Sequence, residues 1–109
     1  MKKFIALYCN TSGAHQPQPE LSDKEKEQMM APWGTWAAKC GDRLLDMGSP
    51  FAPASSSTDG NSWVPSKNFI TGYSIVQAKD LAEAEELFKG HPIYGYPDHA
   101  VEISECVAM

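Results

Sequence analysis

The sequence predicts an α+β fold in which helices cover one face of a mainly antiparallel sheet. Residues 71–107 read as strand, helix, strand, with alternating apolar side chains before and after an amphipathic helix over 80–90. The N-terminal half repeats this order with a longer helix and a shorter second strand. A chain of 109 residues is the size of one domain, so we assign residues 1–109 to a single domain.

The first predicted strand, residues 3–9, is apolar on both faces. The alternating sets are Phe4, Ala6 and Tyr8 on one side and Ile5, Leu7 and Cys9 on the other. A strand that is apolar on both sides needs cover on both sides. Helices of the same chain supply one cover, and in so short a chain a second subunit supplies the other. The sequence therefore predicts a homodimer.

The first helix is predicted to run from Ser22 to Gly41. Ser22 and Glu25 have the spacing of a capping box, and glycine is a typical C-terminal stop. The apolar stripe between them consists of Met29, Trp33, Trp36 and Cys40, with Met30 and Ala37 beside it. Pro32 interrupts the pattern at a cost of roughly 3 kcal/mol or more, so we expect either a kink or two short helices.

The second strand is predicted at residues 43–47. Residues 51–67 are too long for a plain connection, so they form either a flap or a short extra hairpin around the turn pair Asp59–Gly60. The third strand, residues 71–78, alternates between two faces. One face carries Thr71, Tyr73 and Ile75, and the other carries Gly72, Ser74 and Val76.

The second helix begins at Asp80, with Glu83 at the capping-box position. Its buried stripe is predicted to be Leu81, Ala84, Leu87 and Phe88, with Gly90 as the stop. In the last strand Val101, Ile103 and Val107 are expected to face inward, with Glu102 and Ser104 outward. The complete order predicts a split βαβ, or ferredoxin-like, plan.

The order and spacing of several segments resemble the YCII-related family, also described under the name DGPF. These segments are residues 2–8, 27–31 leading to 34–36, 43–45 followed by 48–50, 72–76 followed by 80–84, and His91–Pro92 before 101–103. The resemblance spans nearly the whole chain and implies a dimeric α+β barrel, two ferredoxin-like subunits packed sheet to sheet. Some members carry a histidine on the first helix with a nearby Asp, proposed as an active-site pair. Residues 22–41 contain no histidine and carry Trp33 and Trp36 near that position.

Composition narrows the functional classes. The net charge is −5 and the basic residues are scattered, which disfavours nucleic acids and anionic membrane surfaces as partners. No stretch is long enough to span a membrane, and the apolar run at the start is too short for a signal peptide. Cys9, Cys40 and Cys106 have neither disulfide-framework nor zinc-site spacing. We expect reduced thiols, a cytoplasmic protein, and no metal or cofactor.

Two side chains are candidates for catalysis. His91 either complements the dipole of the preceding helix or acts as a general acid or base at a pocket mouth. Asp46, at the end of an apolar strand, is either exposed or a buried carboxylate with a shifted pKa and a partner such as Tyr73. The other two histidines are expected to be a solvated loop residue, His15, and a polar loop-to-strand residue, His99.

Aromatic side chains are numerous for a chain of this length. They either pack in the core and a dimer interface or hold a flat, apolar ligand between helices and sheet. The residues expected to line that cleft are Tyr8, Trp33, Trp36, Tyr73 and Tyr94. The leading hypothesis is a homodimer that binds a small, mostly apolar molecule there. The alternatives are an enzyme using His91, with Asp46 or Tyr73 assisting, in proton transfer or hydrolysis, and a non-catalytic dimeric assembly module.

Overall fold

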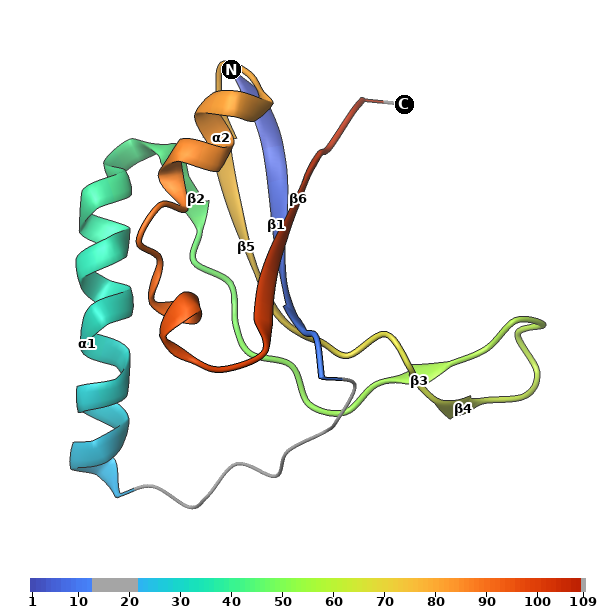
Figure 1. Cartoon of the computed structure of the whole chain (residues 1–109). Coiled ribbons are helices and arrows are strands. Elements are labelled where there is room, and N and C mark those ends of the chain that lie inside the picture. The colour runs from blue at the N-terminus through green and yellow to red at the C-terminus, as the bar shows by residue number, and fades with distance from the viewer. Residues whose placement is uncertain (13–21, 109) are drawn as a thin grey trace.

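The computed structural model describes residues 1–12 and 22–108, so the predicted position of His15 lies outside the described residues. A four-stranded sheet carries two helices on the same face (Figure 1). The elements are β1 (Lys2–Asn10), α1 (Asp23–Cys40), β2 (Leu44–Asp46), β3 (Ser55–Ser56), β4 (Val64–Pro65), β5 (Ile70–Ala78), α2 (Leu81–Leu87) and β6 (His99–Glu105). The predicted α+β class with a mainly antiparallel sheet is confirmed.

The strand order in the main sheet is β2-β5-β1-β6, and each neighbouring pair is antiparallel. β1 and β2 flank α1 in the chain, yet β5 lies between them in the sheet. In the same way β5 and β6 flank α2, and β1 lies between them. Each strand–helix–strand unit therefore encloses one strand of the other unit, and the edge strands are β2 and β6.

The register separates a helix-covered face of the sheet from an uncovered one. On the covered face lie Phe4, Ala6 and Tyr8 of β1, all at most 3% exposed. Opposite them in β5 are Val76, Ser74 and Gly72, and in β6 Ile103 and Val101. The other face, called the open face below, consists of Lys3, Ile5, Leu7, Cys9, Thr71, Tyr73, Ile75, Gln77, Glu102 and Ser104. Figure 1 shows no helix on this side.

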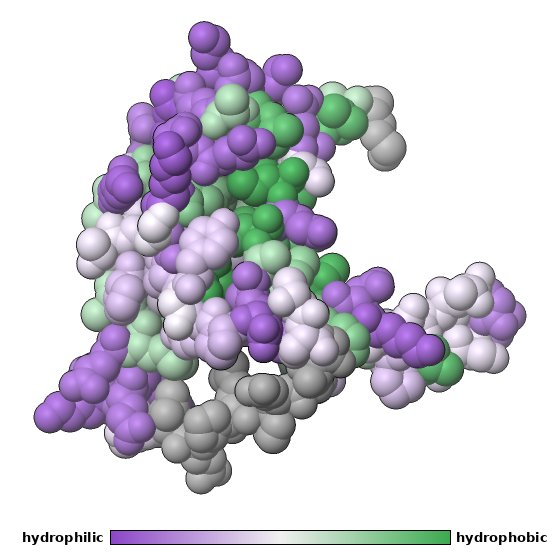
Figure 2. All heavy atoms as spheres, in the orientation of Figure 1, coloured by the Kyte–Doolittle hydropathy of each residue, from purple (hydrophilic) through white to green (hydrophobic). Residues whose placement is uncertain are grey.

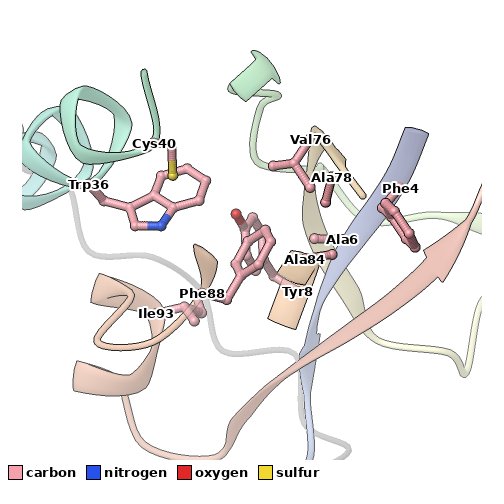
Figure 3. Close-up of a cluster of buried hydrophobic side chains, with 10 residues drawn as sticks. All are labelled: Phe4, Ala6, Tyr8, Trp36, Cys40, Val76, Ala78, Ala84, Phe88 and Ile93. Atoms are coloured by element: carbon pink, nitrogen blue, oxygen red, sulfur yellow. The ribbon is translucent and has the colours of Figure 1, made fainter. Parts of the chain in front are cut away.

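The covered face carries the hydrophobic core, which forms as the alternation of the strands and the stripe of α1 predict. Figure 3 shows Trp36 and Cys40 from α1, together with Ala84 and Phe88 from the α2 region, gathered over Phe4, Ala6 and Tyr8 of β1. Arg43, just after α1, forms an ion pair with Glu83 of α2, which joins the two helices at one end.

α1 is one continuous helix, so the expected break into two short helices is wrong. Pro32 lies inside it and cannot donate to the carbonyl of Gln28. Both residues are on the exposed side, where water can bond that carbonyl. Ser22 caps the helix as predicted, since its hydroxyl accepts the Glu25 N–H. Met30 is 51% exposed rather than part of the stripe, because it lies about 90° around the helix from the stripe's centre.

Two smaller expectations are also corrected. Leu81 is 47% exposed because it occupies the first turn of α2, before the buried pair Ala84 and Phe88. Val107 is 70% exposed rather than inward-facing, because β6 ends at Glu105 and no sheet surface lies beyond it. Between α2 and β6, residues 92–95 form a short 3-10 turn.

For residues 51–67 the structure has the hairpin rather than the flap. β3 and β4 pair with each other, and the Ser66 N–H donates to the Ala54 carbonyl at the base. At the tip Gly60 has φ +80°. The Asp59 carboxylate accepts the backbone N–H groups of Asn61 and Ser62. The hairpin projects away from the body of the molecule (Figure 1).

Candidate functional site

The most unusual polar residue of the core is His91, which is 2% exposed. Gly90 precedes it with φ +69°, a conformation that turns the chain back toward the sheet after α2. Pro92 follows as the first residue of the 3-10 turn, and the His91 Nδ1 accepts the Ile93 N–H at 3.0 Å. The local sequence Gly-His-Pro thus places the imidazole as the N-terminal cap of this turn, of which Ile93 is buried and Tyr94 exposed.

Aromatic rings surround the imidazole. Their centroids lie 4.4 to 5.5 Å from the His91 ring, with two edge-to-face contacts from α1. These neighbours, called the aromatic cluster below, are Tyr8, Trp33, Trp36 and Phe88. Trp36 is further fixed because its indole N–H donates to the Leu87 carbonyl at 2.8 Å. The imidazole therefore fills the space between α1 and the sheet.

A chain of hydrogen bonds leads from His91 across the sheet. Because Nδ1 accepts from Ile93, a neutral imidazole carries its proton on Nε2, which lies 3.2 Å from the Tyr8 hydroxyl. The Tyr8 hydroxyl is 2.6 Å from the Ser74 Oγ. Ser74 in turn donates to the Met47 carbonyl at 2.7 Å, which can only accept. Each hydrogen bond in the chain therefore has a defined donor. The Nε2–H donates to Tyr8, the Tyr8 hydroxyl donates to Ser74, and the Ser74 hydroxyl donates to Met47.

Burial keeps this chain uncharged. It lowers the pKa of His91 to about 4, because the imidazolium would lose its hydration. Burial also raises the pKa of Tyr8 to about 12, against a smaller opposite effect of the Ser74 hydrogen bond. Near pH 7 both groups are neutral. An imidazolium would also need Nδ1 as a donor, which conflicts with the Ile93 N–H that points at it.

This arrangement stabilises the closed core and leaves no nitrogen of His91 free to take a proton from a substrate. Both ring nitrogens are engaged, and the aromatic cluster shields the ring from solvent. His91 lies neither at a pocket mouth nor on the exposed end of α2. A substrate would reach it only after an α1 tryptophan moved aside.

The structure does not bring Asp46 and Tyr73 to His91, so the expected assistance is corrected. The Tyr73 hydroxyl donates to the Asp46 carboxylate at 3.0 Å, and the Gly48 N–H donates to its other oxygen at 2.8 Å. The bond to Asp46 raises the pKa of Tyr73. Tyr73 belongs to the open face, whereas the adjacent Ser74 belongs to the covered face with His91. The sheet separates the two groups.

Of the five residues expected to line a ligand cleft, three meet around His91: Tyr8, Trp33 and Trp36. Tyr73 lies on the open face, and Tyr94 is 55% exposed on the 3-10 turn. Ser74 was not among the candidates, although its place in an alternating row of small and apolar inward residues signals a buried hydroxyl that needs a partner.

A shallow groove of about 410 Å³ runs along the outer side of the aromatic cluster, between α1 and the connection that follows α2. Its lining residues are Pro32, Thr35, Trp36, Lys39, Lys89, Gly90 and Pro92. The groove combines apolar ring surfaces with two ammonium groups. Lys89 also contacts the exposed Glu86 carboxylate at 3.0 Å.

Comparison with protein-family models gives no match to this chain, and neither does comparison with curated protein sequences. In residues 1–12 and 22–108, no three side chains of His, Cys, Asp or Glu are grouped to hold a metal ion. Over the same residues, neither helix has the length and apolar character needed to cross a bilayer.

Proposed function

We propose that the protein is a cytoplasmic homodimer of two YCII-related, ferredoxin-like subunits packed sheet to sheet, and that it binds a small, mostly apolar molecule. The ferredoxin-like assignment rests on the interleaved sheet order and on both helices covering one face. The compartment rests on the thiols of Cys9, Cys40 and Cys106, none of which is in a disulfide.

The open face is the observation that supports the dimer. Ile5 and Leu7 at its centre are only half-buried, beside Tyr73 and Ile75 of β5. Each such side chain is less than 36% exposed, so covering it contributes at most about 1 kcal/mol, and the four together contribute at most about 4 kcal/mol. A twofold interface would place this one surface against itself, as in most homodimers.

Replacing Ile5 by Lys tests the dimer by placing a charge at the centre of the open face. We expect Ile5→Lys to be a folded monomer, because the ammonium group stays solvated only when no second sheet covers it. Leu81→Lys is the matched control, since it adds the same charge on the exposed side of α2. Light scattering coupled to size-exclusion chromatography gives the masses, and circular dichroism checks the fold. A wild-type monomer at micromolar concentration would refute the dimer.

The groove over Trp36 is the observation that supports ligand binding. The originally expected position, between Trp36 and the sheet, holds the His91 imidazole. The groove outside it retains the apolar surface of Pro32 and Pro92 over an edge of Trp36, which is only 4% exposed, and adds Lys39 and Lys89 to the lining. A flat apolar molecule with a carboxylate would match both features, since a charge-assisted hydrogen bond is about twice as strong as a neutral one.

Indole-3-acetate and its neutral amide are a matched pair of probes for this groove. We expect the acid to bind about tenfold more tightly than the amide in isothermal titration calorimetry. The double variant Lys39→Gln/Lys89→Gln should remove that difference, whereas Lys24→Gln, in the first turn of α1 and outside the groove, should leave it unchanged. Equal binding of acid and amide, or no binding of either, would contradict the proposal.

A further inference from the structure

The hairpin of residues 54–66, called the arm below, has no structural explanation within a single chain. Among residues 1–12 and 22–108 its strands pair only with each other, and two-stranded hairpins are at best marginally stable in water. Trp63 and Val64 are 63% and 59% exposed on it. The arm extends past one end of the sheet toward the side of the open face (Figure 1).

The open face alone is a small surface for a stable homodimer. Four strands about 4.8 Å apart and about seven residues long, at about 3.3 Å per residue, present roughly 440 Å² in projection. Stable interfaces bury about 800 Å² on each partner. The arm lies next to this face, and Trp63 and Val64 are large apolar side chains that can supply part of the difference. The arm therefore most naturally contacts the same second copy that covers the open face.

The ends of the open face indicate how that copy is oriented. Lys3 lies at the end near the chain termini, opposite Gln77, whereas Glu102 lies opposite Leu7, near the centre of the face. A copy in the same direction brings the two Lys3 side chains to the same end of the interface, whereas a copy turned end for end separates these like charges. The end-for-end arrangement also brings each arm to the partner's C-terminal segment, where Val107 is 70% exposed.

Figure 2 shows the surface of one chain that such a copy would meet. Hydrophobic residues line a recess between the C-terminal segment and the projecting arm. A second copy in the end-for-end orientation would enter this recess and place its own arm at the opposite end. Such pairs of reciprocal contacts are what twofold symmetry requires.

We infer that the arm of each protomer reaches around the open face of a second copy and packs Trp63 and Val64 against the partner's C-terminal segment near the partner's Val107. This inference rests on the proposed homodimer and names the part of the chain that secures it. The arm then acts as a clamp, and the dimer contains two such contacts.

Truncating the arm tests whether it secures the dimer. Because the Ser66 N–H donates to the Ala54 carbonyl, the base of the hairpin can be closed by replacing residues 55–65 with Gly-Gly. We expect the circular dichroism of the body to be retained and the dimer dissociation constant in sedimentation equilibrium to rise at least about 30-fold, the effect of losing one central aromatic anchor. Trp63→Ala should show most of this rise, and Asn61→Ala, whose side chain is exposed at the turn and whose backbone bond to Asp59 is retained, should show none.

A photo-crosslinker in place of Trp63 tests the orientation. Irradiation of the dimer, followed by mass spectrometry, should join position 63 to the partner's residues 105–108. Crosslinks to the partner's arm would overturn the end-for-end arrangement. A dimer whose dissociation constant is unchanged by truncation would overturn the clamp while leaving the homodimer intact, whereas a monomeric wild type would refute the homodimer itself.

Discussion

Acidification should destabilise the protein by about 3 kcal/mol through His91 alone. The imidazole has a pKa of about 4 in the folded protein and an ordinary value of 6.5 when unfolded. Above pH 6.5 it is neutral in both states and contributes no pH dependence. Below pH 6.5 the unfolded chain binds a proton that the folded chain does not, so the free energy of unfolding falls by about 1.4 kcal/mol per pH unit. The fall ends near pH 4, where the folded state also becomes protonated.

Urea unfolding between pH 7 and pH 4.5 at one fixed protein concentration measures this slope through tryptophan fluorescence. The wild-type slope includes carboxylates that titrate in the same range, so the informative quantity is its difference from a variant. His91→Asn retains an acceptor for the Ile93 N–H and cannot titrate. We expect it to be less stable than the wild type at pH 7 and to have a shallower slope between pH 6.5 and pH 4.5.

Two results would refute this reasoning. One is an equal slope in wild type and His91→Asn, with His99→Asn as the control that another histidine is not responsible. The other comes from nuclear magnetic resonance of the imidazole. The structure requires a neutral ring protonated at Nε2 throughout the range above pH 5, so titration of the His91 resonances near pH 6.5 would show that the ring is solvated.

Two further predictions follow from backbone and side-chain geometry. Tyr8→Phe should lower the free energy of unfolding by about 1–3 kcal/mol in urea titrations, because His91 and Ser74 each lose a buried partner; an effect below 0.5 kcal/mol would show that water replaces the hydroxyl. Gly48→Ala should prevent folding or cost well above the roughly 1 kcal/mol of strain expected for Gly60→Ala. Both glycines have φ near +80°, but a Cβ at Gly48 would lie 1.7 Å from a carbonyl oxygen of β5, whereas at Gly60 no atom of the described residues lies within 4 Å. Equal melting temperatures of the two variants would contradict this.

The alternation of β1 and β5 was sufficient to predict which side chains share a face, because the period of two leaves no other choice once the strand is recognised. The same rule placed Tyr73 and Ser74 on opposite faces. Applied one step further, it separates Tyr73 from Tyr8, which bonds to Ser74, and from His91, which bonds to Tyr8. The alternation alone gives the faces of Tyr73 and Ser74. Only the hydrogen-bond partners of Ser74, which the pattern does not give, show that His91 lies on the face opposite to Tyr73.

The position of His91 could not be predicted from local sequence, because it depends on a backbone conformation and on a side chain that is distant in the sequence. The turn depends on a positive φ at Gly90, and the direction of the ring depends on Tyr8, a residue 83 positions away. A histidine after a helix ordinarily interacts with the helix end. Here the capping bond to Ile93 and the surrounding rings provide a better environment for the neutral form.

The two faces of the sheet differ in what they require from outside the chain. In the described part of the chain, no buried side-chain nitrogen or oxygen lacks a hydrogen-bond partner, so the covered face is complete within one subunit. The groove over Trp36 is lined only by α1 and the connection after α2, away from the open face. A monomeric Ile5→Lys variant should therefore bind indole-3-acetate with the affinity of the wild-type dimer in calorimetric titrations. Loss of binding in that variant would show that the partner subunit contributes to the site, and the separation of ligand binding from dimerisation would be wrong.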